Sequence, residues 1–397
     1  MKCILYFVFV FVSFSFCVSA QTTFKFNALL DAELSMAGED SHYYYNEIHT
    51  DYTNIRFGIS QLNAIGELKI KKQLSFNVRL LLERDIGQQL SKFSVPQLNM
   101  QWLSKKRKVG LTVGAFTNPF GYYNTKQLST DRNFIGLPLA YAYYFNISDK
   151  IGYVEGMGDI DWVWIDGEVQ WGSTNLYYGG YTVGAMLSWN IKPSKINWKL
   201  ALVSGASTQQ KRFTDPLNFG VISRLKFQLN YFWEQGLSIS YGTFMQKSEV
   251  SDQLENLRAY NQTLIGTDYK LGTGFFEFSG EVIGAFYQVP QFNSEDRTFD
   301  NNTLRLRNLS ANLDIKYEPP FIQGSYIAYR IDYLGFSKLD IDQSPHWDNN
   351  VVRHSLALGY NINQYLLARV TVSTQHVDNW QWDNTQRTFR LVLTAHY

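Results

Sequence analysis

The last ten residues of the chain alternate between apolar and polar side chains. The apolar side chains share one face of an extended chain: Phe389, Leu391, Leu393, Ala395 and Tyr397. The polar side chains share the other face, with Val392 as an exception: Thr388, Arg390, Thr394 and His396. A strand of about 9–11 residues with this period spans a membrane with one face toward lipid and one toward water. Because lipid cannot satisfy an open sheet edge, we expect this strand to close a barrel on the strand that begins near Phe24.

The first twenty residues have the pattern of a secretory signal peptide. Lys2 precedes an apolar run from Ile4 to Val18, and the small residues that end at Ala20 predict cleavage before Gln21. The run is too short for a permanent membrane helix, which needs roughly 20 apolar residues. We therefore expect residues 1–20 to be removed and residues 21–397 to reach the outer membrane through the periplasm as a single domain.

The cysteines and the composition narrow the class of protein further. Both cysteines, Cys3 and Cys17, lie in the signal sequence, so we expect no disulfide and no thiolate metal site in the mature chain. Aromatic residues make up 16% of the chain, although its mean hydropathy is −0.24. A hydrophilic, aromatic-rich exported chain is typical of a large β-barrel with aromatic girdles. The net charge of +1 gives no basis for nucleic-acid binding.

The same alternation continues along the whole mature chain and is interrupted by short turns and long loops. We count eighteen strands, with sixteen as the alternative if the segments Ile151–Glu155 and Ile160–Gln170 are not wall strands. The phase of the second strand slips near Gln61-Leu62, which predicts a β-bulge. The predicted fold is all-β: a transmembrane, antiparallel, up-and-down barrel with short periplasmic turns and long extracellular loops.

These features together resemble the Gram-negative outer-membrane porins. Within the pattern, Val113–Phe116 followed by Pro119–Gly121 is similar to the strand end and loop entry of phosphate-selective-porin-like proteins. The resemblance implies contact with outer-membrane lipid, small hydrophilic solutes as partners, and a homotrimer as the assembly. The lysine-lined ladder of the phosphate-selective family is not carried over, because this chain shows arginines at the inward positions instead.

The longest segment without clean alternation, Thr117–Ser148, is the candidate constriction loop. Loops of this length are uncommon unless they are functional. The segment contains more apolar and aromatic residues than a solvated loop favours, together with the charged pair Asp131 and Arg132. We expect it to fold into the lumen and narrow it. The alternative is an outward loop that packs on its neighbours or on another subunit.

Charged residues are predicted on two facing walls of the lumen. Nine arginines point inward by local alternation: Arg56, Arg79, Arg224, Arg305, Arg307, Arg330, Arg353, Arg369 and Arg390. An acidic group is predicted on the opposite wall: Glu155, Asp159, Asp161, Asp166 and Glu168. Facing walls of opposite charge would set a field across the pore and favour anions or zwitterions. The alternative is that the charges only solvate and cross-link the wall, and Asp314 and Asp332 on the basic side favour it.

The function predicted is that of a porin, which lets small hydrophilic solutes, including anions, diffuse passively and with weak selectivity. We expect no cofactor, no metal and no enzymatic activity. Two alternatives are a substrate-specific transporter and a component of an outer-membrane assembly. A third is an outer-membrane hydrolase that uses His42, His346 or His376, although no nucleophile motif accompanies these histidines.

Overall fold

The computed structural model shows a closed β-barrel. The residues that the structure describes are 22–37, 55–84, 90–154, 164–165, 168–169, 172–176, 181–208, 218–339, 346–378 and 385–397. Sixteen strands of these residues form one antiparallel ring, which in ring order contains β1 (Thr22–Ala37), β2 (Arg56–Ile70), β3 (Leu74–Arg84), β4 (Leu90–Leu103), β5 (Val109–Thr117), β10 (Tyr181–Lys192), β11 (Ile196–Val203), β12 (Gly220–Gln228), β13 (Trp233–Thr243), β14 (Asn261–Thr273), β15 (Phe276–Asn293), β16 (Thr298–Tyr317), β17 (Ser325–Phe336), β18 (Asn350–Asn363), β19 (Leu366–Asp378) and β20 (Thr385–His396).

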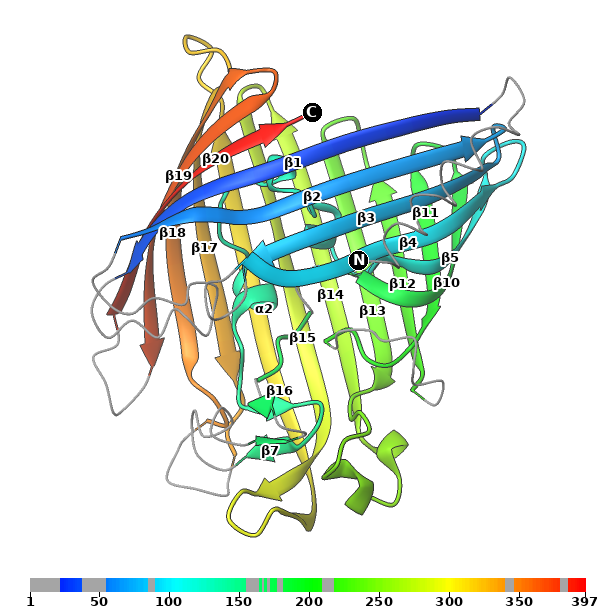
Figure 1. The fold of residues 1–397 in the computed structure, drawn as a ribbon, viewed down its shortest axis with the longest axis vertical. Coiled ribbons are helices and arrows are strands. Elements are labelled where there is room, and N and C mark those ends of the chain that lie inside the picture. The colour runs from blue at the N-terminus through cyan, green and yellow to red at the C-terminus, as the bar shows by residue number, and fades with distance from the viewer. Residues whose placement is uncertain are drawn as a thin grey trace.

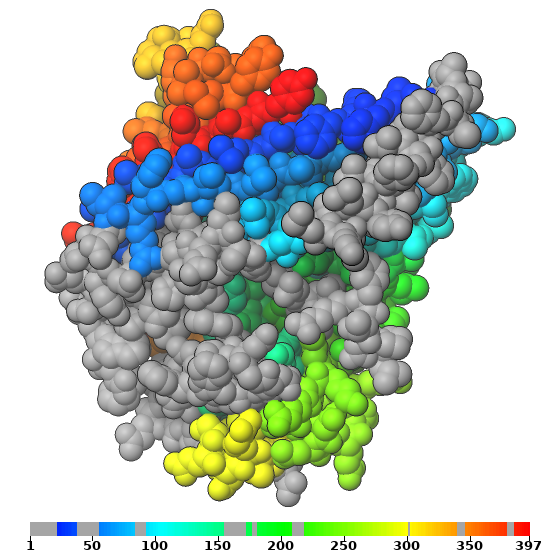
Figure 2. Space-filling model, in the orientation of Figure 1, coloured from blue at the N-terminus to red at the C-terminus, as the bar shows by residue number. Residues whose placement is uncertain are grey.

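The last strand closes the ring on the first, as the sequence predicts. In the pairing of β20 with β1, His396 lies opposite Leu29 and Thr388 lies opposite Ala37. Beyond it, Ala28 and Tyr397 exchange both backbone hydrogen bonds, at 2.9 and 3.1 Å. Figure 1 shows the red β20 against the blue β1, and Figure 2 shows β1 and β2 side by side across one outer face. The prediction of closure on the strand near Phe24 is confirmed.

The two ends of the barrel differ in the length of their connections. Short turns such as residues 71–73, 193–195 and 364–365 all lie at one end, which we call the turn end. The longer connections, such as those from β5 to β10 and from β17 to β18, leave from the other end, which we call the loop end. The carboxy terminus lies at the turn end, because β20 runs toward it. This asymmetry is typical of outer-membrane barrels.

The described parts of the two segments that were predicted as additional wall strands, residues 151–154, 164–165 and 168–169, lie outside the ring. β7 (Gly152–Val154) pairs antiparallel with β6 (Ile147–Ser148) and parallel with the end of β15. β8 (Trp164–Ile165) and β9 (Glu168–Val169) form a separate two-stranded sheet. Strands of two or three residues are far shorter than the roughly nine that cross a bilayer. The described ring therefore has sixteen strands, the lower of the two predicted counts.

Burial alternates along the ring strands, as the period of two requires. In β18, Arg353 and Ser355 are buried on the inner face, whereas His354 and Leu356 are exposed on the outer face. The predicted bulge is present, because the register of β1 with β2 shifts between Asp31 and Ala32. No helix in the described ranges is long and apolar enough to cross a membrane.

Candidate functional site

The segment that follows β5 lies inside the ring. We call residues 118–148 the inner segment; it contains η2 (Tyr123–Thr125), η3 (Ser129–Asp131) and α2 (Leu139–Ala142), and Figure 1 shows α2 behind the first strands of the barrel. Most of this segment has no regular secondary structure, so its backbone N–H and C=O groups need partners from elsewhere. The inward side chains of the wall supply many of those partners.

Contacts of the inner segment reach opposite sides of the ring. The backbone N–H of Tyr123 donates to the carboxylate of Glu281 on β15, at 2.5 Å. Only four residues further, the carbonyl of Gln127 accepts from Arg79 on β3, at 3.3 Å. β15 is the eighth strand from β3 in either direction around the ring. The inner segment therefore crosses the lumen between these two contacts.

Five buried arginines of the wall donate to backbone carbonyls of the inner segment. In pairs of donor and acceptor, they are Arg224 with Gly121, Arg79 with Gln127, Arg369 with Ser129 and Arg132, Arg330 with Gly136, and Arg353 with Leu137. A guanidinium carries five N–H donors in a rigid planar fork, so it can bind a wall partner and a loop carbonyl at once. These arginines belong to five different strands, and they fasten the inner segment along much of its length.

Three of these guanidinium groups also form ion pairs with wall carboxylates, two on the adjacent strand and one, Asp268, on the strand beyond it. Arg330 binds Asp314 through two bonds of 2.6 Å, and Arg353 binds Asp332 at 3.0 and 3.1 Å. Arg224 binds Asp268 at 2.6 Å. The Arg330 guanidinium also lies 4.3 Å from the ring centre of Phe134 in the inner segment. Buried charges are tolerated only when they are paired and hydrogen-bonded, and these pairs neutralise the arginine side of the wall.

Carboxylates hold further groups of the inner segment. The Asp31 carboxylate accepts from Ser129 at 3.0 Å, and Glu281 accepts from the hydroxyl of Tyr141 at 2.8 Å. In the loop before β18, Asp348 accepts from the backbone N–H of Asn146 at 2.7 Å and from the Tyr143 hydroxyl at 3.2 Å. Burial raises the pKa of the Asp348 carboxyl to about 7, against an ordinary value of 3.8. Asp348 therefore changes charge near neutral pH.

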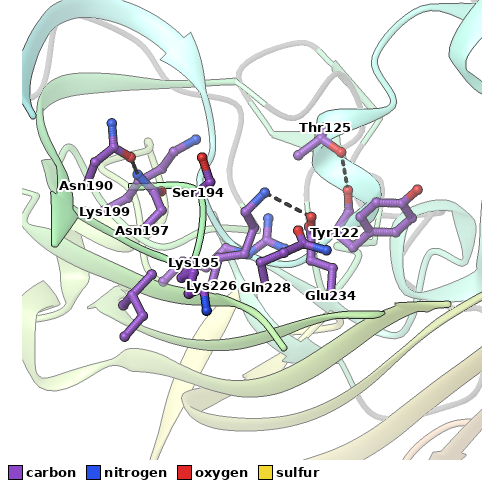
Figure 3. Close-up of a pocket in the computed structure, with 12 residues that line it drawn as sticks. Tyr122, Thr125, Asn190, Ser194, Lys195, Asn197, Lys199, Lys226, Gln228 and Glu234 are labelled. Carbon is purple, nitrogen blue, oxygen red and sulfur yellow. Dashed lines mark hydrogen bonds and ion pairs between the residues drawn. The ribbon is translucent and has the colours of Figure 1, made fainter. Parts of the chain in front are cut away.

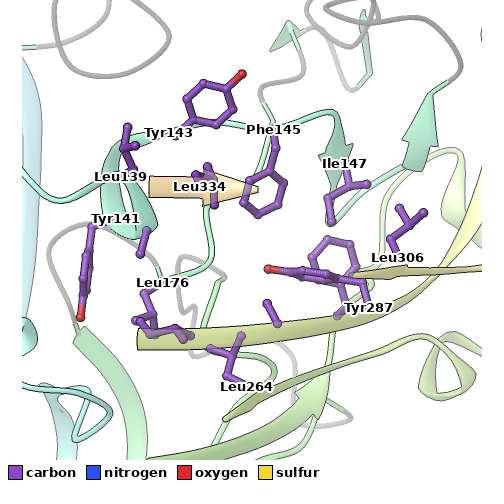
Figure 4. Packing of buried hydrophobic residues seen from close by; sticks show 14 of the residues in the cluster. Leu139, Tyr141, Tyr143, Phe145, Ile147, Leu176, Leu264, Tyr287, Leu306 and Leu334 are labelled. Atoms are coloured by element: carbon purple, nitrogen blue, oxygen red, sulfur yellow. The ribbon is translucent and has the colours of Figure 1, made fainter. Parts of the chain in front are cut away.

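The inner segment also packs on an apolar part of the wall near the loop end. Figure 4 shows Phe145 and Ile147 beside Leu334, Tyr287 and Leu306 of the wall. Phe145 makes edge-to-face contacts with Tyr287 and Trp347, with ring centres 5.8 and 5.6 Å apart. Hydrophobic burial and the arginine contacts therefore act together to hold the segment inside.

This apolar packing explains why two of the predicted lumen arginines lie elsewhere. In β16, Leu304 and Leu306 are buried, whereas Arg305 and Arg307 are exposed and share the opposite face. β16 has 20 residues, about twice the length that a membrane requires, so its first part extends beyond the bilayer at the loop end. There the inner face packs on the inner segment and the outer face meets water, which reverses the usual polarity. The expectation that Arg305 and Arg307 face the lumen is therefore corrected.

The other predicted site residues have separate positions. Arg390 is partly buried and binds Glu33 at 2.8 Å, and Arg56 is half-buried near the start of β2. In the inner segment, Arg132 is buried, and the exposed Asp131 carboxylate accepts from the backbone N–H of Leu128 at 3.3 Å. Asp161 and its predicted acidic neighbours Glu155, Asp159 and Asp166 lie outside the described residues, as does the side chain of Glu168. No group of metal-ligating side chains occurs in the described part of the chain.

A cavity of about 580 Å³ lies between the inner segment and the wall at the turn end. Figure 3 shows Tyr122 and Thr125 of the inner segment on one side of it and residues of β10 to β13 on the other. Its charged lining residues are Lys195, Lys199, Arg224, Lys226 and Glu234. The cavity is the space that the described residues leave beside the inner segment.

Several residues of this site were not found from the sequence alone. Glu281 holds two groups of the inner segment, and Lys199 lines the cavity. Both occupy the polar positions of otherwise alternating strands, which is the signal that could have revealed them. The prediction used mainly the apolar positions of these strands and the arginines.

Several known structures share the fold of this chain. No protein-family model and no curated protein matches the sequence. An anion-selective porin from Comamonas acidovorans superposes with a TM-score of 0.59 at 9% identity, covering 95% of this chain and 100% of that chain. OmpF of Salmonella typhi, solved in complex with daunomycin, superposes with a TM-score of 0.58 at 9% identity, covering 94% of this chain and 97% of that chain.

The chain has a porin-like fold. A third structure with this fold is the trimer form of OmpT, an outer-membrane protein of Vibrio cholerae, with a TM-score of 0.56 at 9% identity and coverage of 95% and 100%. At such low identity the likeness concerns the path of the backbone, so the residues that determine what passes must be judged from this chain's own lumen.

Proposed function

We propose that this porin-like barrel is an outer-membrane channel for the passive diffusion of small hydrophilic solutes. The inner segment acts as its constriction. The observation that carries the proposal is the hydrogen bonding of this segment to β3 and β15, on opposite sides of the ring. A segment that crosses a barrel of sixteen strands divides the aqueous interior that such a barrel would otherwise enclose.

In this proposal the buried arginines position the constriction and do not form a free charged wall. Arg330, Arg353 and Arg224 each bind a carboxylate as well as a carbonyl of the inner segment. A guanidinium that is paired in this way has little remaining field to act on a passing ion. Solutes pass beside the inner segment, where the cavity faces β10 to β13.

Liposome swelling with uncharged sugars of increasing size tests the channel itself. The barrel is folded in detergent, its folding is verified by heat-modifiable migration, and it is then reconstituted into liposomes. We expect swelling with the smallest sugars and a steep loss of rate with size, because the inner segment narrows the lumen. Absence of swelling with the smallest sugar from a verified folded barrel would contradict the proposal and would favour a closed transporter or an assembly component.

We also propose that the barrel is a homotrimer. The support is the trimer form of the Vibrio cholerae protein OmpT, which shares the fold. Chemical cross-linking in a mild detergent, followed by mass measurement, is expected to give three chains per particle. A single-chain particle under the same conditions would refute this assembly.

A further inference from the structure

Cations face one another across two neighbouring strands beside the cavity. In the register of β11 with β12, Lys199 lies directly opposite Arg224, and Asn197 lies opposite Lys226. All four of these side chains line the cavity. Like charges directly opposite each other destabilise a sheet, and here Asp268 offsets the charge of Arg224 but not that of Lys199. Such a local conflict is typical of a functional position.

Two of the cavity cations already have carboxylate partners. Arg224 binds Asp268 at 2.6 Å, and Lys226 binds Glu234 at 2.9 Å, the contact drawn in Figure 3. Lys199 is half-buried and forms no ion pair with the residues that the structure describes. Lys195, in the exposed turn between β10 and β11, likewise has no carboxylate partner among them. Within the described lining, the cavity therefore retains positive charge after its internal pairing.

We propose that Lys199 is the residue that determines the charge preference of the channel, and that it favours anions. This inference rests on the proposed channel function. A small anion that enters the cavity meets Lys199 beside the constriction, with Lys195 at the turn-end mouth. The charge of Lys199 is not offset by a carboxylate among the described residues, so the site attracts anions without a specific contact to their remaining parts. The nine predicted arginines do not have this role.

The test is the reversal potential in a planar bilayer under a KCl gradient. We compare the wild type with K199Q, with the charge reversal K199E and with K69Q as the matched control. Lys69 lies near the turn end of β2 and pairs with Glu67 at 3.0 Å, and β2 is five strands from β11 around the ring. K69Q therefore makes the same change in net charge at the same end of the barrel but away from the cavity.

The wild type is expected to prefer chloride over potassium. K199Q should lower the chloride-to-potassium permeability ratio about tenfold, because one unit charge at about 5 Å in water favours chloride and disfavours potassium by about threefold to fourfold each. K199E should bring the ratio below one, and K69Q should leave it close to the wild-type value.

Three results would overturn the assignment. One is a K199Q channel with the wild-type ratio, and another is a wild type that prefers potassium; each removes the role of Lys199 but leaves the channel intact. The third is the absence of any conductance from verified folded barrels, which removes the channel function together with this inference.

Discussion

The contact between Arg330 and the inner segment offers the sharpest perturbation. Arg330 is 2% exposed, and it binds Asp314 through two bonds of 2.6 Å and the carbonyl of Gly136 at 3.0 Å. Replacement by methionine, R330M, keeps much of the side-chain volume but leaves the Asp314 carboxylate buried without its cation. Removing one partner of a buried pair costs about 3–5 kcal/mol. We expect the free energy of unfolding of R330M to fall by that amount.

Two further variants separate the pair from the general loss of an arginine. R305M removes an arginine that the sequence pattern groups with Arg330. Because Arg305 is exposed, the free energy of unfolding of R305M should stay within about 0.5 kcal/mol of the wild-type value. The double variant D314N/R330M also removes the unpaired Asp314 carboxylate, so it should recover part of the lost free energy of unfolding. The assay is urea unfolding of the barrel in detergent or lipid, followed by tryptophan fluorescence. Equal unfolding midpoints for R330M and R305M would refute the claim that Arg330 holds a structural network.

The remaining predictions concern the inner segment and a carboxylate that binds it. G121A should loosen the inner segment and raise single-channel conductance, because Gly121 has φ +69° and a new Cβ would lie 2.8 Å from Glu281 Oε1. The control is G274A, since Gly274 has φ +56° but lies in open space, and this variant should conduct as the wild type does. Equal conductance of the two variants would argue against the packing of Gly121 on Glu281. The unfolding midpoint of the wild type should fall as pH rises from about 4 to 7, because the raised pKa of Asp348 lets the folded state bind a proton that the unfolded state has released. D348N should flatten this pH dependence in urea titrations, and an unchanged slope would mean that Asp348 does not titrate near neutrality.

The period of two predicted the closure of the barrel and the faces of many wall residues. It correctly assigned the outward Leu391 and Leu393 and the buried Thr388 and Thr394 of β20, and it located the bulge in β2. It succeeded because a strand inside the bilayer must turn apolar groups to lipid and polar groups inward. The strand count was harder, since short alternating stretches such as residues 151–155 look like wall strands until their pairing is known.

The site could be predicted only in part, because its chemistry depends on contacts between distant segments. Arg330 and Arg353 point inward as alternation requires, but nothing local shows that their donors meet the carbonyls of Gly136 and Leu137. The alternation rule also assumes that the chain lies within the membrane, and it reverses at Arg305, where β16 extends beyond it. To predict the face of such a residue, one must know the length of its strand and which segment packs on the strand's inner face.

Single-channel conductance of the wild type, compared with a variant whose residues 119–147 are replaced by a short Gly/Ser linker, tests the central claim most directly. The two proteins are recorded in the same bilayer after their folding is verified by heat-modifiable migration. The account predicts small, steady openings for the wild type and several-fold larger openings for the variant, because the segment that crosses between β15 and β3 is gone. Openings of equal size in the two proteins would contradict the claim that the inner segment forms the constriction.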